Sequence, residues 1–254
     1  MEKAKPGSKG LRQMFIVAGL ATAILGGVLQ TEDYFTWRAL ISEAPDHVPA
    51  VPRLASFAEK RGRDAFLGNC ATCHGENLRG DQTKGVPDLT DNDWLYGTGR
   101  VSDIERTVLY GIRSGNGKAR NVADMPPMGR QRTLVGEEVG DVVAYVLSLS
   151  GSEADKDAAE RGSKLFQDKG VCYDCHGRDG EGISDYGAPN LSDAKWLYGG
   201  DAKAITASVY HGRHGVCPAW MGTLSFMAIR AIAVYIHSAS KEAPGAATQA
   251  AATP

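Results

Sequence analysis

Two copies of one five-residue pattern carry the most specific chemistry in the sequence. The first is Cys70-Ala71-Thr72-Cys73-His74, and the second, 102 positions later, is Cys172-Tyr173-Asp174-Cys175-His176. Two thiols separated by two residues match the two vinyl groups of one porphyrin, and the histidine that follows is placed to ligate its iron. A zinc site or a redox dithiol requires no histidine at this position. The pattern therefore predicts two covalently bound haem c groups, one on each copy.

The other side of the first iron needs a second ligand, which in electron-transfer haems is commonly a methionine sulfur. Met125 and Met128 lie in Met125-Pro126-Pro127-Met128-Gly129, beginning 51 residues after His74. Proline keeps this segment out of a helix, which favours a ligand loop over core packing. We expect Met125 to ligate the first iron, with Met128 as the alternative, because the segment that Met125 opens aligns with the second half.

The residue aligned with Met125 in the second half is Cys217, the one cysteine outside the two haem patterns. Three interpretations compete. Cys217 binds the second iron as a thiolate, which lowers the reduction potential of that haem. Alternatively, Met221 is the ligand and Cys217 is a small buried hydrophobe. In the third, a second imidazole comes from His211 or His214. We take Cys217 as the predicted ligand.

Further residues are expected to support the haems. Pro87 and Pro189 each lie thirteen residues after a haem histidine, and their carbonyls are placed to accept the imidazole N–H and fix its tautomer. Two tryptophans and two tyrosines are expected to line the pockets and to reach the propionates with their N–H and O–H groups. Arg113 and Arg213, aligned at an offset of 100, are expected to pair with propionates. The aromatic residues are Trp94, Trp196, Tyr96 and Tyr198.

The elements that position these residues form a duplicated unit. Trp94-Leu95-Tyr96-Gly97 matches Trp196-Leu197-Tyr198-Gly199 at the same offset of 102 as the haem patterns. Each half ends in an apolar stripe with helical spacing, Val139 to Leu147 in the first and Ile229 to Ile236 in the second. We therefore predict an all-α fold with two tandem cytochrome c domains, at 57–150 and 151–241, followed by a disordered tail at 242–254.

The N-terminus predicts a membrane anchor. Basic residues precede the sixteen-residue apolar run Met14 to Leu29, and Tyr34, Phe35 and Trp37 follow it as an aromatic belt. No small-residue cleavage site follows the run, so residues 1–30 are expected to anchor the chain in the lipid bilayer, and 31–56 to form a linker rich in proline. The alternative is a cleaved signal peptide. Both place the haem domains on the periplasmic side of a bacterial inner membrane.

The sequence resembles the diheme class I c-type cytochrome that forms the third subunit of cbb-type haem–copper oxidases. In the first half, the segments that carry this resemblance are Cys70–Gly75, Pro87–Gly97 and Ala144–Gly151, and in the second half they are Gly187–Asp193, Trp196–Gly199 and His211–Trp220. The resemblance implies His/Met-ligated haems that relay electrons from a soluble cytochrome to an oxidase core. Where that family has its second methionine, this chain has Cys217, and the first half carries an insertion, Asn116 to Asp124.

Two functions remain in competition. The first is an electron carrier without activity of its own, which serves a membrane or periplasmic oxidoreductase complex. The second is a catalytic diheme cytochrome, of the thiosulfate-oxidising or peroxidase type, that uses the second haem with Cys217. The sequence contains no nucleophile elbow, zinc-protease helix or phosphate-binding loop. The net charge of −2 leaves no basic face for a nucleic-acid partner.

Overall fold

Helices are the regular elements of this computed structural model, which describes residues 31–241. The extended pairings within that range are isolated bridges rather than sheets, so the predicted all-α class is confirmed for it. Between residues 31 and 241 no helix is long and apolar enough to cross a membrane. The predicted anchor at 1–30 and the predicted tail at 242–254 lie outside the described residues.

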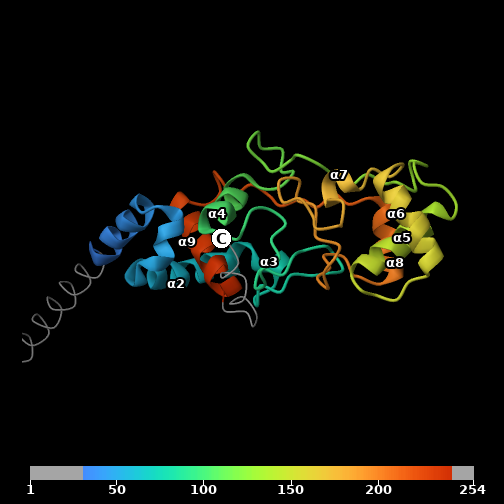
Figure 1. Ribbon diagram of the computed structural model, residues 1–254. Helices are drawn as coiled ribbons and strands as arrows, with labels where there is room; N and C mark the ends of the chain where they lie inside the picture. Colours follow the sequence, from blue (N-terminus) through green and yellow to red (C-terminus); the bar gives the residue numbers. More distant parts are fainter. Residues whose placement is uncertain (1–30, 242–254) are drawn as a thin grey trace, which may run out of the picture.

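The helices fall into two groups at opposite ends of an elongated molecule, joined by coil segments (Figure 1). After residues 31–42, which are helical, the chain forms the 3₁₀ helix η1. The remaining elements are α2 (Pro52–Asn69), α3 (Ala71–His74), α4 (Val101–Tyr110), α5 (Glu138–Leu149), α6 (Lys156–Gln167), α7 (Tyr173–His176), α8 (Ala202–His211) and α9 (Phe226–Lys241), with η1 at Pro45–Ala50.

The two halves of the chain exchange their closing helices. Figure 1 shows α9, the last helix, beside α2 and α4 of the first half, while α5 lies with α6 and α8 of the second. Accordingly, the first core joins Phe66 of α2 to Ile232 of α9, and the second joins Val142 of α5 to Phe166 of α6. The expected domains 57–150 and 151–241 follow one another in the sequence, but neither range builds a core by itself.

Two glycines explain how closely the exchanged helices cross. A Cβ on Gly62 of α2 would overlap the carbonyl oxygen of Ala231 in α9, and a Cβ on Gly162 of α6 would overlap that of Asp141 in α5. Only glycine permits such a backbone approach. The two crossings lie at equivalent places in the two halves, so the duplication is preserved in three dimensions even though the partners are exchanged.

Polar contacts fasten the exchanged helix α9 to the first half. The guanidinium of Arg230 pairs with the buried carboxylate of Glu105 in α4, and its Nη1 donates at 3.0 Å to the carbonyls of Leu40 and Glu43. Nδ1 of the buried His237 lies 2.7 Å from the carbonyl oxygen of Gly99. These partners come from three separate segments of the first half, so α9 is integral to the first unit.

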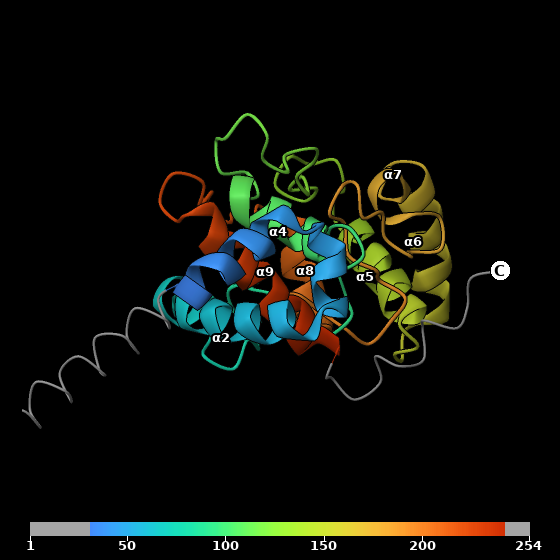
Figure 2. The same cartoon turned by 90° about the vertical axis from the view of Figure 1, so that its left-hand side faces the viewer.

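Residues 31–56 are not the linker that the sequence predicted. Leu40, Val48 and Leu54 are buried in the first core, and Figure 2 shows the segment lying against α2 and α9. The prolines that suggested an extended spacer instead begin helices, because Pro45 and Pro52 occupy the first helical turns, where proline is well tolerated. This segment therefore packs on the first core and does not stand apart from it.

Candidate haem-binding sites

The two haem patterns occupy equivalent one-turn helices. In the first half α3 follows α2 directly, with the amide of Cys70 donating to Phe66 at 2.7 Å. In the second half a short segment separates α6 from α7, and the amide of Cys172 donates to Phe166 at 3.0 Å. Glycines with positive φ, Gly75 at 74° and Gly177 at 78°, end both turns. All four cysteines are free thiols, so each pair is available for thioether bonds to one porphyrin.

Each haem histidine is held by a proline carbonyl. Nδ1 of His74 lies 3.4 Å from the carbonyl oxygen of Pro87, and Nδ1 of His176 lies 3.0 Å from that of Pro189. These are the contacts expected from the thirteen-residue spacing. Because Nδ1–H donates to the carbonyl, Nε2 is left with its lone pair, which is what an iron ligand requires. Burial lowers the pKa of both imidazoles and favours the same neutral form.

The tryptophans lie within their own halves, whereas the tyrosines cross between them. Trp94 packs against the first core and Trp196 against the second. The ring of Tyr96 lies directly on Gly187, and the ring of Tyr198 lies directly on Gly85. Each tyrosine, expected to line a haem pocket, thus covers the loop that follows the haem pattern of the other half.

Arg120 is the structural equivalent of Arg213, although the comparison of the two halves by sequence did not pair them. Arg213 lies over the ring of Tyr198 at 3.9 Å and donates to Ser208 at 3.0 Å. Arg120 lies over Tyr96 at 5.0 Å and donates to Thr107, also at 3.0 Å. Since α4 and α8 end at Gly111 and Gly212, the true offset here is 101. Arg120 lies within the insertion of the first half, Asn116 to Asp124, so the alignment at a fixed offset did not pair it with Arg213.

Arg113, which the alignment had matched to Arg213, plays another part. Its Nε donates to the carbonyl of Gly215 at 2.6 Å, and its Nη1 donates to the carbonyl of Ala123 at 3.0 Å. Nη1 also lies 3.4 Å from the hydroxyl of Tyr96. Arg113 thus ties together the two loops that cross between the halves. A carboxylate oxygen of Asp124 also lies 3.4 Å from its Nε.

The sulfur residues are also exchanged between the halves. Met125 pairs through its backbone with Arg213 and packs, together with Met128, in the second core. Cys217 pairs through its backbone with Ile112, and the thiols of Cys70 and Cys73 lie near enough to interact electrostatically with its own. The expected assignment of Met125 to the first iron and Cys217 to the second does not fit this placement. The crossing of the chain after α4 and again after α8 is the physical reason.

The remaining ligand candidates lie on the surface. The side chain of Met221 is 53% exposed, while its amide donates to Leu109 at 3.1 Å. His211 is exposed and stacks edge-on with Tyr210. His214 is also exposed, and its Nδ1 lies 2.9 Å from a carboxylate oxygen of Asp124. All three side chains are exposed, whereas those of Met125 and Cys217 are partly buried.

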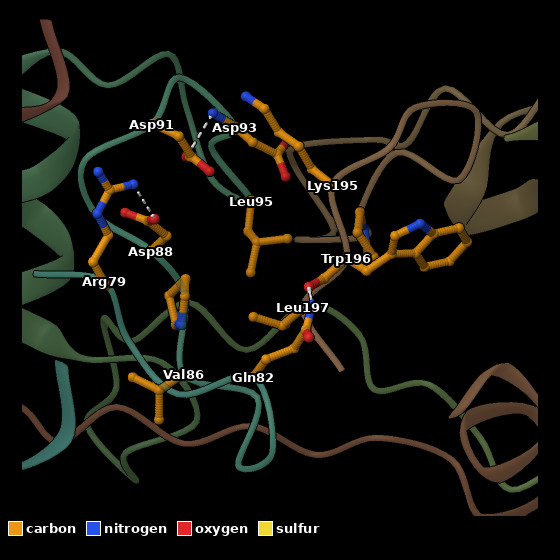
Figure 3. A pocket seen from close by; sticks show the side chains of 12 residues that line it. Arg79, Gln82, Val86, Asp88, Asp91, Asp93, Leu95, Lys195, Trp196 and Leu197 are labelled. Carbon is orange, nitrogen blue, oxygen red and sulfur yellow. Dashed lines mark hydrogen bonds and ion pairs between the residues drawn. The ribbon is translucent and has the colours of Figure 1, made fainter. Parts of the chain in front are cut away.

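A charged pocket of about 200 Å³ is lined by both Pro87 and Pro189, the prolines whose carbonyls contact the haem histidines. Figure 3 shows Arg79 and Asp88 pointing toward one another, with Nη1 and Oδ2 3.1 Å apart, and Asp93 beside Lys195. Burial raises the pKa of Asp93, and the nearby carboxylates add to this effect. At this junction Gln82 donates to the carbonyl of Trp196 at 2.6 Å, which joins the halves.

Comparison with known proteins identifies a cytochrome family in each half of the chain. Residues 59–150 match the family described as cytochrome c, and residues 157–236 match the family described as cytochrome c oxidase, cbb3-type, subunit III. The cbb3-type cytochrome c oxidase subunit CcoP of Cereibacter sphaeroides is 40% identical over 190 residues, which cover 75% of this chain and 64% of the relative. The FixP subunit of Bradyrhizobium sp. strain ORS 278 is 43% identical over 189 residues, covering 74% and 63%.

The match to a third relative is longer. The FixP subunit of Azorhizobium caulinodans is 37% identical over 235 residues, covering 88% of this chain and 78% of the relative. Against the CcoP subunit of Cereibacter sphaeroides and the FixP subunit of Bradyrhizobium, by contrast, the chain spans slightly less than two thirds of the relative's length. Both haem patterns lie inside the matched ranges, so each half is a cytochrome c unit with one covalent haem c.

Proposed function

The chain belongs to the family of the CcoP and FixP subunits of cbb3-type cytochrome c oxidases, and we propose that it relays electrons to the catalytic core of such an oxidase. The observation that carries this proposal is the duplicated histidine geometry. Both haem histidines are oriented by a proline carbonyl thirteen residues later, at 3.4 and 3.0 Å. Two haems held in the same manner within one rigid chain suit a relay of single electrons.

Haem c supplies a reversible one-electron change at its iron. The protein's part is to attach, orient and shield it. His74 and His176 present a neutral Nε2, because Nδ1–H is given to a carbonyl. Met125 would supply a sulfur ligand to the second haem, a role supported by its packing against the same core as Trp196 and Leu191. Met128 is buried in the same core and serves as packing. Arg120 and Arg213 offer guanidinium groups to propionates.

The relay also requires that the two haem units keep a fixed separation. Tyr96 on Gly187, Tyr198 on Gly85, and Gln82 bonded to Trp196 all join loops that follow the two haem patterns. These contacts are reciprocal, so rotation of one unit against the other would disturb all of them. A junction of this kind suits electron transfer within the chain better than a hinge would.

The chain is held at the periplasmic face of the inner membrane by the apolar run Met14 to Leu29. Tyr34 and Phe35 support this part of the proposal. They are 56% and 65% exposed at the start of the described chain, with ring centroids 5.5 Å apart. Exposed aromatic side chains close to an apolar span are typical of the membrane–water interface. Extraction of membranes with alkaline carbonate tests this, because an anchored chain stays in the pellet.

The relay is tested in the assembled oxidase. Full-length chain is co-expressed with the oxidase subunits and purified in mild detergent, and oxygen uptake is measured with a reduced soluble cytochrome c as donor. Cys172→Ala/Cys175→Ala, which removes the second attachment site, is expected to abolish most of this uptake. A small artificial reductant that reaches the core directly should still support it. Uptake that survives the double substitution unchanged, or a chain that purifies without oxidase subunits, contradicts the proposal.

A further inference from the structure

The segment that contains Cys217 is fixed to the first haem unit, although it belongs to the second half of the sequence. The amide of Cys217 donates to the carbonyl of Ile112 at 3.0 Å, and the amide of Ile112 donates back at 2.9 Å. A Cβ on Gly111, whose φ is 75°, would overlap the carbonyl oxygen of Cys217. The segment is thus held closely against the end of α4.

The thiol of Cys217 has surroundings that suit a ligand. Cys70 and Cys73, which attach the first haem, both interact with it electrostatically. The only hydrogen-bond contact that Sγ makes within residues 31–241 is a long one of 3.8 Å to the adjacent carbonyl of Pro218. No strong protein acceptor therefore competes for this sulfur there.

The second half provides an independent comparison. Met125 pairs with Arg213, one residue after the glycine that ends α8, and Cys217 pairs with Ile112, one residue after the glycine that ends α4. In each unit, therefore, a sulfur residue from the other half is bridged to the same position. Met221, the competing sulfur of this segment, is 53% exposed. Trp220, the residue before Met221, packs against the first core.

We propose that Sγ of Cys217 is the distal iron ligand of the first haem, the one attached through Cys70 and Cys73. On ligation the S–H bond breaks, the proton passes to water, and the sulfur electron pair forms the bond to iron without a change in oxidation state. A thiolate donates more electron density than a thioether. The first haem therefore has a lower reduction potential than the second, and an electron shared within the chain resides mainly on the second haem.

This inference depends on haem attachment and not on delivery of electrons to an oxidase, so its failure leaves the relay intact. The test uses full-length holoprotein and two substitutions, Cys217→Ser and Cys217→Met. Cys217→Ser is expected to convert the first haem from low to high spin in its optical and electron paramagnetic resonance spectra. Cys217→Met is expected to keep it low spin, raise its potential in a redox titration and produce the near-infrared band of a methionine-ligated haem.

The affected haem is identified by a second substitution. Cys73→Ala leaves one vinyl group of the first haem unreacted, which displaces that haem's visible absorption band and labels it. Cys175→Ala labels the second haem in the same way. The Cys217 effects should appear in the band displaced by Cys73→Ala, and Met221→Leu should change neither haem. Unchanged spectrum and potential in both Cys217 variants overturn the proposal, as does a change confined to the second haem.

Discussion

The ring of Tyr198, from the second half of the chain, lies directly on Gly85 in the loop that follows the first haem pattern. The reciprocal contact, Tyr96 on Gly187, is equally close. Each glycine also has a positive φ, 67° and 68°. These positions therefore require glycine twice over, once for the backbone and once for the ring above it. The two haem units are held together by a pair of equivalent contacts, and this leads to the first prediction.

Gly85→Ala is expected to lower the free energy of unfolding by about 2–4 kcal/mol, because a left-handed conformation and an overlap with Tyr198 both oppose the new methyl group. Gly115→Ala is the matched control, since Gly115 has a φ of 81° and no atom within 4 Å of the place where a Cβ would lie. Its free energy of unfolding should fall only by the cost of the left-handed backbone conformation, about 1–2 kcal/mol. Guanidinium unfolding of the holoprotein, followed at the haem bands, gives both values. Equal losses in the two variants would contradict the tyrosine contact.

The crossing of α2 and α9 gives a second prediction. Gly62→Ala places a methyl group against the backbone of Ala231, so we expect a loss of about 1–3 kcal/mol from overpacking, or more if α9 is displaced. Gly68→Ala lies in the same helix with open space around it. That substitution should stabilise the protein by about 0.5–1 kcal/mol through helix propensity. Thermal unfolding of both variants is the measurement, and a Gly62→Ala protein as stable as the parent would refute the exchanged packing.

The buried pair of Arg230 and Glu105 gives a third prediction. Arg230→Met leaves the Glu105 carboxylate and two backbone carbonyls without their donor, which should cost about 3–5 kcal/mol. Glu105→Leu/Arg230→Met removes both charges and is expected to recover part of this loss, as buried pairs often tolerate apolar replacement. Denaturant unfolding of the parent, the single variant and the double variant measures whether their stabilities follow this order. A double variant no more stable than Arg230→Met would show that the carboxylate is not the source of the cost.

What the sequence predicted well is local. The haem patterns, the proline spacing and the apolar stripes of α5 and α9 all depend on residues near one another in the chain, and the structure contains each of them. The duplication was visible for the same reason. A fixed offset between matching residues reveals two similar units, whichever helix each unit recruits to complete its core.

What the sequence could not supply is which half completes which core. The stripe of α9 fits either Gly62 of α2 or Gly162 of α6, because both helices offer the same glycine and the same phenylalanine partner. The choice is made by specific contacts such as Arg230 with Glu105 and His237 with Gly99. The expected ligands assumed unexchanged units, whereas the structure packs Met125 against the second core and pairs the backbone of Cys217 with Ile112. Arg120 was missed because the insertion changes the offset.

The last prediction concerns His237, which lies in α9 at the contact with the first half. Its side chain is buried, and Nδ1–H donates to the carbonyl of Gly99 at 2.7 Å. Burial lowers the pKa of this imidazole, and Lys241 adds to that effect, while the Gly99 bond and Asp46 oppose it. The folded protein therefore holds His237 neutral at pH values where the unfolded chain, with a pKa near 6.5, already takes up a proton.

Because the unfolded state binds more protons in that interval, stability is full above about pH 7 and falls as the pH drops through 6.5 to the lower folded value. The slope from one such group is at most about 1.4 kcal/mol per pH unit. His74 and His176 do not contribute in the holoprotein, since iron occupies them. His237→Asn keeps a donor near Gly99 but cannot titrate, so its unfolding free energy should show a shallower dependence between pH 7 and 5. The same slope in both holoproteins would place the titrating group elsewhere.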